Sequence, residues 1–182
     1  MSRAIKIHKE GFEAKPGRIG NGAYFWTAIT DDHLPLSSLL AIRWAERASQ
    51  DWGSYAQDED PSLAVVQVEV EVARDEILYL DDPEFNLDLR QTLTEFAVQH
   101  FKLASIFDMS QKQFEEIQEK LYAIVEGYIK LVEKHRGNAI RIVFKNQKPP
   151  AKRDVFGQIV GNASCFSVRD TSCIKDMLVS AA

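Results

Sequence analysis

The sequence has few cysteines and prolines and no long apolar run. It contains 182 residues, with two cysteines, Cys165 and Cys173, and six prolines. Two cysteines supply neither a disulfide framework nor a zinc cluster, so reduced thiols and no metal site are expected. No apolar stretch approaches the length of a membrane-spanning helix, and the start MSRAIKIHKEG lacks a signal-peptide core. We therefore expect a cytoplasmic protein with no membrane contact.

An excess of positive charge is lacking as well. Lys and Arg number 22 against 27 Asp and Glu, which gives a formal net charge of -5. This balance argues against binding of nucleic acid mainly by electrostatic attraction, although KNQKPPAKR (145–153) is a local basic cluster. Hydrophobic residues make up 45% and charged residues 27%, as in ordinary globular proteins. Without repeats or low-complexity linkers, the chain is expected to form one domain, 1–182.

The order of strand and helix patterns predicts an α+β fold. A short helix or strand, a glycine turn, an aromatic strand and a helix capped by Ser37 or Ser38 come first. AVVQVEVEV (64–72) then alternates as a half-buried antiparallel strand does, and EILYL (76–80) is expected to continue that sheet. AIRIVFK (139–145) and a last strand, SCFSVRD (164–170), follow the helical middle of the chain. Strands, then helices, then strands indicate α+β rather than regular βαβ alternation.

Two long amphipathic helices are predicted within about 83–137. The second has a capping box, Ser110 to Gln113, and ends at Gly137. Their apolar faces indicate that the helices pack in the core. A docking surface for a protein partner is the second interpretation.

The stretch GRIGNGAYFW (17–26) allows two interpretations. Asn21-Gly22 is a strong tight-turn signal, so the segment can be a plain hairpin leading into a strand. Alternatively, the glycines bring the backbone close to a ligand on which an aromatic ring stacks. A phosphate loop of the common types is disfavoured because a strand follows the glycines and GK[ST] is missing.

EGF (10–12), GRIGNGAYFW, AIRWA (41–45) and SCFSVRDTSCI (164–174) occur in that order along the chain. Taken together they resemble the ADP-ribosyltransferase-like (PARP-like) fold family. The resemblance implies small antiparallel sheets that form a split NAD-binding cleft, with the helices at 83–137 as an insertion. It also implies transfer of a single ADP-ribose unit from NAD to a protein or nucleic acid, in a toxin-like or phage-defence role.

The resemblance assigns a role to each matching residue. Tyr24 would stack on the nicotinamide ring, and Trp44 would be the second aromatic wall. Cys165 stands where many members carry a catalytic glutamate. The remaining expected NAD contacts are His8 for the ribose and nicotinamide, Arg18 for the pyrophosphate, and Gly20 and Gly22 for close backbone approach.

Two alternatives remain open. The cysteine in place of glutamate, and the absence of the histidine that the family usually carries upstream, favour a degenerate domain that binds nucleotide, nucleic acid or protein without catalysis. The other alternative is an interaction protein built on the paired helices, in which GRIGNGAYFW is only a hairpin. The degenerate domain would keep a pocket at Tyr24, whereas the interaction protein would have none there.

Overall fold

The structure is a computed structural model that describes residues 2–148 and 157–182. It confirms the α+β class. The helices are α1 Ser2–Glu10, α2 Leu34–Trp52, α3 Pro83–Phe101, α4 Gln111–Arg136 and α5 Gly157–Val160. The strands are β1 Ala23–Trp26, β2 Ala64–Val70, β3 Ile77–Tyr79, β4 Ile142–Gln147, β5 Ala163–Val168 and β6 Ile174–Ala181. No helix among the described residues is long and apolar enough to cross a membrane.

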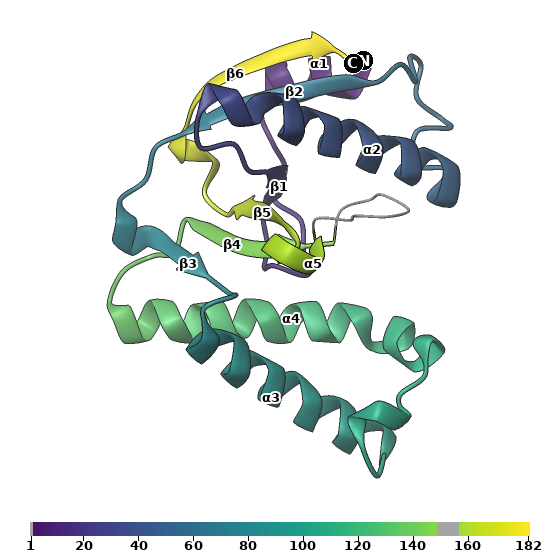
Figure 1. Ribbon diagram of the computed structural model, residues 1–182, viewed down its shortest axis with the longest axis vertical. Coiled ribbons are helices and arrows are strands. Elements are labelled where there is room, and N and C mark those ends of the chain that lie inside the picture. The colour runs from purple at the N-terminus through teal and green to yellow at the C-terminus, as the bar shows by residue number, and fades with distance from the viewer. Residues whose placement is uncertain (1, 149–156) are drawn as a thin grey trace.

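The strands form two small sheets. One has the order β1-β5-β4-β3, and the other pairs β2 with β6. Figure 1 shows the β2–β6 pair with α1 and α2 on one side of the four-stranded sheet, and α3 and α4 on the other. All pairings are antiparallel except β3 with β4, which are parallel. The parallel pair follows from connectivity, because the chain between these strands crosses over through α3 and α4.

Two details of the sequence prediction are wrong. EILYL does not continue the sheet of β2, because a 3₁₀ turn at Arg74–Glu76 redirects the chain and β3 pairs with β4 instead. Helix α2 is capped by neither Ser37 nor Ser38. It begins at Leu34 with a proline in its first turn, and the buried Ser37 donates its hydroxyl to the His33 carbonyl at 2.9 Å.

The predicted limits of α4 are confirmed. Its capping box forms, since the Gln113 amide donates to Ser110 Oγ at 3.3 Å and the Ser110 amide donates to Gln113 Oε1 at 2.9 Å. Gly137 follows the helix in a left-handed conformation. The two orphan groups at the helix start are therefore satisfied locally, which is why this boundary was visible in the sequence.

SCFSVRD is not the last strand, since β6 follows it and pairs with β2 along Ala64–Val70. The hydrophobic alternation of β6 is weak because Leu178 is 59% exposed on the edge of a two-stranded sheet, while Met177 and Val179 are half-buried. Such a strand lacks the clean alternation that marked β2.

The four-stranded sheet is apolar on both faces. Leu78, Val143 and Cys165 point toward α4 and pack with Val125 and Ile129 in one core cluster. A second cluster lies toward β2 and β6, formed by Ile142, Phe166, Val168 and Cys173. Neighbouring residues on β4 and β5 thus serve opposite faces, as strand geometry requires.

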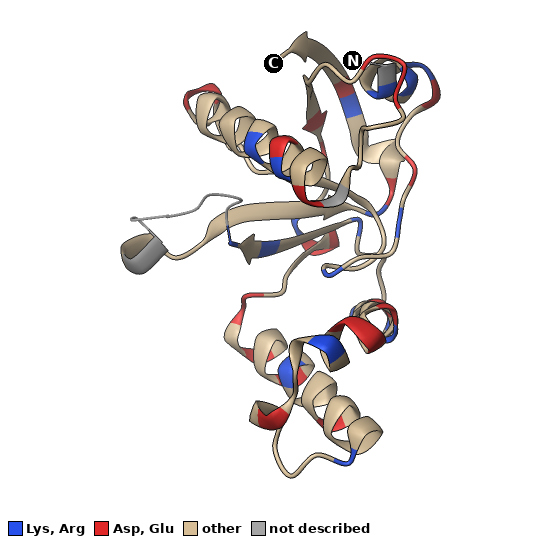
Figure 2. Cartoon of the chain, turned by 90° about the vertical axis from the view of Figure 1, so that its right-hand side faces the viewer, with Lys and Arg blue, Asp and Glu red and all other residues tan. Residues whose placement is uncertain are grey.

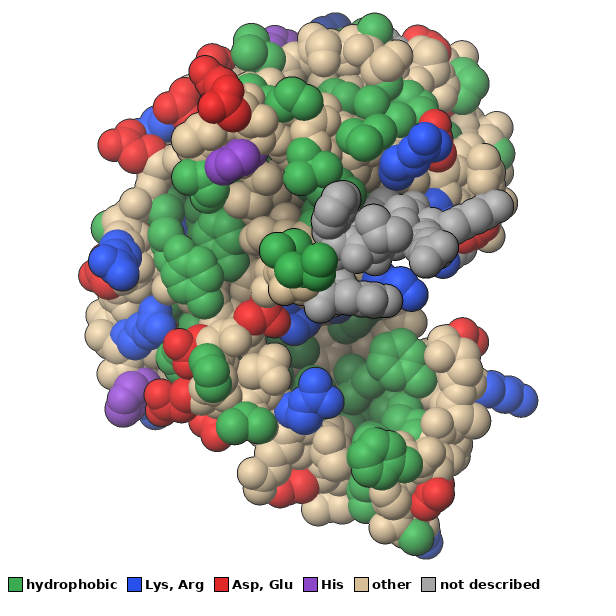
Figure 3. Space-filling view, in the orientation of Figure 1, with side chains coloured by type: hydrophobic (Ala, Val, Ile, Leu, Met, Phe, Trp, Pro, Cys, Tyr) green, Lys and Arg blue, Asp and Glu red, His purple; other side chains and the backbone are tan. Residues whose placement is uncertain are grey.

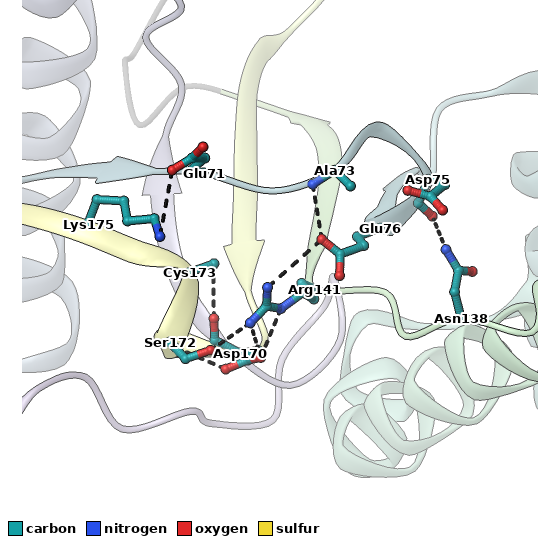
Figure 4. Close-up of polar contacts among 10 residues, drawn as sticks. All are labelled: Glu71, Ala73, Asp75, Glu76, Asn138, Arg141, Asp170, Ser172, Cys173 and Lys175. Carbon is teal, nitrogen blue, oxygen red and sulfur yellow. Dashed lines mark hydrogen bonds and ion pairs between the residues drawn. The ribbon is translucent and has the colours of Figure 1, made fainter.

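A polar cluster fixes the connection that leaves β5. Asp170 accepts two hydrogen bonds from Arg141 of the segment before β4, at 2.9 and 2.7 Å, and one from the Ser172 amide at 3.0 Å. Figure 4 shows Arg141 between Asp170 and Glu76, so that β4, β5 and the turn before β3 meet there. Hydrogen bonds from Ser172 and Arg141 lower the pKa of Asp170 to about 2.

Candidate functional site

A large cavity lies against the β1–β5 end of the four-stranded sheet. Its volume is about 1350 Å³, and its lining comes from β1, β2, β4, β5, α2 and Tyr122 of α4. Ordinary small-molecule pockets measure roughly 300–1,000 Å³. The cavity is therefore larger than an ordinary small-molecule pocket.

On the side facing β2 and β6, the cavity floor is a row of aromatic rings. Phe25, Phe166 and Phe144 are register partners on β1, β5 and β4, with ring centroids 5.4 and 5.3 Å apart. Phe12 meets the Phe25 ring edge-on at 5.0 Å. Each ring was visible in the sequence, but only the strand register reveals that they form one surface.

Helix α2 forms the wall opposite this floor. It contacts β1 and β2, and it presents Trp44 to the cavity with 46% of that residue exposed. Ser37, Ser38 and Arg47 line the same wall. Trp44 therefore lines the cavity.

Tyr24 lines the cavity from the other face of the sheet. It is the register partner of Ser167, and Trp26 is the partner of Cys165, whose side chain packs toward α4. The Tyr24 hydroxyl donates to the Gly20 carbonyl at 2.6 Å and accepts from the Ile19 amide at 3.2 Å. Burial raises the pKa of Tyr24 to about 12, although 39% of the residue remains exposed. Tyr24 and Trp44 thus lie on opposite sides of the sheet and do not enclose one ring between them.

Gly20 and Gly22 lie close to other protein atoms rather than to the cavity. A methyl group on Gly20 would overlap Ile129 of α4, and one on Gly22 would overlap the Ser167 hydroxyl on β5. Gly20 also has a φ of +86°, which side chains rarely adopt. Neither glycine lines the cavity, so in this structure their small size serves packing.

A buried charge cluster ties the glycine turn to α4. Glu126, which is 8% exposed, accepts from the Asn21 amide at 2.9 Å and from Arg169 Nη1 at 2.5 Å. Arg169 also pairs with Glu133 at 3.3 Å and donates to the Ile140 carbonyl at 2.9 Å. Sequence reasoning missed Glu126, because a glutamate on an amphipathic helix ordinarily faces solvent.

Cys165 is a buried thiol. It is 7% exposed, and burial raises its pKa to about 12. The group is therefore neutral near pH 7 and supplies neither a carboxylate charge nor a reactive thiolate. Cys165 lies within the cavity lining, but its chemistry differs from that of a glutamate at this point.

The remaining expected residues divide into two groups. Arg18 is exposed and lines the cavity near Tyr24 and Cys165, where its charge opposes the rise in their pKa values. His8 lies exposed on α1, which packs against β2 and β6, and does not line the cavity. The structure thus gathers Arg18, Tyr24, Trp44 and Cys165 around one cavity and leaves out His8 and the two glycines.

Within residues 2–148 and 157–182, no group of three or more His, Cys, Asp and Glu side chains is arranged to hold a metal ion. Comparison with protein-family models, with curated proteins and with solved structures finds no match to this chain.

Proposed function

We propose that the cavity binds NAD and that the protein transfers a single ADP-ribose unit from it to a macromolecular acceptor. The observation that carries this proposal is that Trp44 and Tyr24, which lie on opposite sides of the sheet, both line one cavity, with Arg18 near Tyr24. NAD has two flat rings separated by a pyrophosphate. One aromatic side chain at each end and a guanidinium near the phosphates suit such a ligand.

In the proposed complex the nicotinamide ring lies against Tyr24, and the adenine lies toward Trp44 and the aromatic floor. Two hydrogen bonds to the glycine turn hold the Tyr24 ring in place, so little side-chain freedom is lost on stacking. Arg18, being exposed, is free of the desolvation that would weaken a phosphate contact.

The reaction breaks the bond between the nicotinamide nitrogen and the anomeric carbon of its ribose. Nicotinamide leaves with the bonding electron pair as a neutral molecule, and an acceptor heteroatom donates a pair to that carbon. The acceptor's proton passes to solvent. Orientation of the two reactants beside Tyr24 and Trp26 is the contribution that this chain's residues make to the step.

Binding of NAD without transfer is the second candidate, and Cys165 favours it. A developing oxocarbenium ion is stabilised by negative charge or by dipoles fixed beside it. The neutral thiol of Cys165 brings no charge, and the nearby carboxylate of Glu126 is already paired with Arg169.

Radiolabelled NAD incubated with the purified chain, total protein and total RNA tests the proposal. Trp44→Ala and Tyr24→Ala should each weaken NAD binding by about three- to tenfold, because each removes a stacking partner. Cys165→Ala should leave binding unchanged, and Lys6→Gln, a change on α1 outside the cavity, is the matched control.

Transfer of label by the wild type, reduced by both aromatic substitutions, supports the enzyme. Binding that responds to the substitutions without any transfer supports the non-catalytic candidate. If NAD at millimolar concentration produces neither binding nor transfer, the proposal is wrong.

A further inference from the structure

Part of the cavity lies on the α4 side of the sheet. Besides Tyr24 and Cys165, its lining there includes Trp26 on β1, Gln147 on β4 and Tyr122 on α4, and we call this part the α4 groove. Figure 3 shows the molecule hollowed between the sheet layer and the helical pair, with hydrophobic side chains on the helical side. Trp26 faces α4 because it packs on the core cluster that contains Ile129.

Gln147 brings an unused hydrogen-bond donor to this groove. Register places it on the same face of β4 as Val143 and Lys145, which is the face turned toward α4. Its Nε2 atom is buried and has no hydrogen-bond partner within the described part of the chain. A buried donor left unpaired in a protein is costly. The Gln147 residue as a whole is only half-buried, so a rotation of its side chain would bring this donor to a ligand that supplies a carbonyl oxygen.

Two aromatic side chains line the same groove. Tyr122 is held by its neighbour one turn earlier, since Gln118 donates a hydrogen bond to its hydroxyl. Trp26 and Tyr122 are both half-buried, so part of each side chain remains accessible. Flat rings beside an amide donor are the features that recognise an unstacked nucleobase, by stacking and by a hydrogen bond to its edge.

Two cations near the groove could contact phosphates. Lys148 directly follows Gln147, and Arg18 lies within electrostatic reach of Tyr24 and Cys165. The acidic residues that line the cavity belong to other elements: Asp31 precedes α2, and Glu69 and Glu71 lie on or beside β2. Arg169 compensates the charge of Glu126 on α4, and the N-terminal half of that helix also carries Glu115, Glu116 and Glu119. Figure 2 shows both signs spread over the molecule, so any attraction for phosphate is local.

We propose that the α4 groove binds an unpaired base of a single-stranded nucleic acid, and that nucleic acid is therefore the acceptor of ADP-ribose. This inference rests on the proposed function, because it places the acceptor beside the nicotinamide end of NAD. The base stacks on Trp26 and accepts a hydrogen bond from Gln147 Nε2. Lys148 and Arg18 contact the adjoining phosphates. A heteroatom of the bound nucleotide then forms the new bond to the anomeric carbon and releases its proton to solvent as nicotinamide leaves.

Fluorescently labelled single-stranded DNA and RNA ten-mers of mixed sequence test the groove by anisotropy, in the absence of NAD. With about two phosphate contacts, the affinity should fall roughly sevenfold between 50 and 200 mM salt. Gln147→Met removes the donor at nearly constant shape, and Tyr122→Ala removes a ring. Each should weaken binding at least fivefold, and Lys148→Gln should also reduce the salt dependence. Lys6→Gln is the control and should change nothing.

Single-tryptophan variants separate this inference from the proposed function. A chain that keeps Trp26 alone, through Trp44→Phe and Trp52→Phe, should respond in fluorescence to the oligonucleotides. A chain that keeps Trp44 alone, through Trp26→Phe and Trp52→Phe, should respond to NAD. Circular dichroism of each variant verifies that it is folded.

Oligonucleotide binding that is weakened by Gln147→Met and detected by Trp26 supports the inference. If Trp44 responds to NAD but neither oligonucleotide binds, or if ADP-ribose is transferred only to protein, the inference is wrong while the proposed function stands. Oligonucleotide binding that stays unchanged in the Gln147 and Tyr122 variants also overturns the inference. Oligonucleotide binding through Trp26 without any NAD response supports the groove as a nucleic-acid site and overturns the transferase.

Discussion

At the scale of single residues, Gly20 lies where the turn before β1 touches α4. Its φ of +86° and the Ile129 side chain next to its missing Cβ both act against a larger residue. Gly11 also has a positive φ, +83°, but its Cβ position meets nothing within 4 Å. The two glycines therefore share a backbone conformation and differ in packing.

This difference predicts the outcome of two matched substitutions. Gly11→Ala should cost about 1–2 kcal/mol of unfolding free energy, the price of a left-handed conformation with a side chain. Gly20→Ala should cost roughly 1–3 kcal/mol more, because Ile129, Arg169 or the turn must move. Urea denaturation monitored by circular dichroism measures both. Equal losses for the two variants would show that α4 does not press on the turn.

At the scale of elements, α4 connects the core to the turn that carries Arg18 and precedes Tyr24. One of its carboxylates, Glu126, binds both the Asn21 amide and Arg169 from the end of β5. Removing one member of a buried ion pair leaves the other charge uncompensated. The helix thereby controls the position of a loop that is distant in sequence.

Glu126→Gln should lower the unfolding free energy by about 3 kcal/mol, because Arg169 loses its closest partner. Lys130→Gln is the control: its contact with Glu126 is 4.0 Å long and its side chain is 67% exposed, so less than about 1 kcal/mol is expected. A double-mutant cycle with Arg169→Met, measured by chemical denaturation, should give a coupling of about 1–3 kcal/mol. Additive losses would contradict a direct interaction.

The sequence was sufficient to predict elements whose signals are local. The alternation of β2 and the capping box of α4 were visible because each depends on neighbours a few residues apart. The sequence did not show which strands pair or on which face of a sheet each side chain lies. Pairing of β3 with β4, the aromatic row, and the placement of Tyr24 and Trp44 on opposite sides of the sheet depend on register between distant segments.

At the scale of the whole molecule, stability should depend on pH at both extremes. The pKa of Asp170 falls from 3.8 to about 2 in the folded state, so its contribution is complete above pH 3.8 and is lost as the pH falls toward 2. The pKa values of Cys165 and Tyr24 rise from 9.0 and 10.0 to about 12. Their contribution is complete below pH 9 and is lost as the pH rises toward 12.

Thermal unfolding from pH 2 to pH 11 checks both limits. Asp170→Asn should flatten the fall in melting temperature on the acid side, and Cys165→Ala should flatten part of the fall on the alkaline side. If the melting temperature falls equally at low pH in the wild type and in Asp170→Asn, the loss of stability there comes from other carboxylates.

The pairing of early strands with late ones also determines when the sheets can form during synthesis. Among the described strands, β1 pairs with β5 and β2 pairs with β6, so each leaves the ribosome well before its partner. Until then a nascent chain carries strands with open edges, and the α3–α4 hairpin can form before the sheets do. The cavity consequently has no counterpart in a chain translated only as far as β4, and ligand binding should begin only once β5 and β6 have emerged.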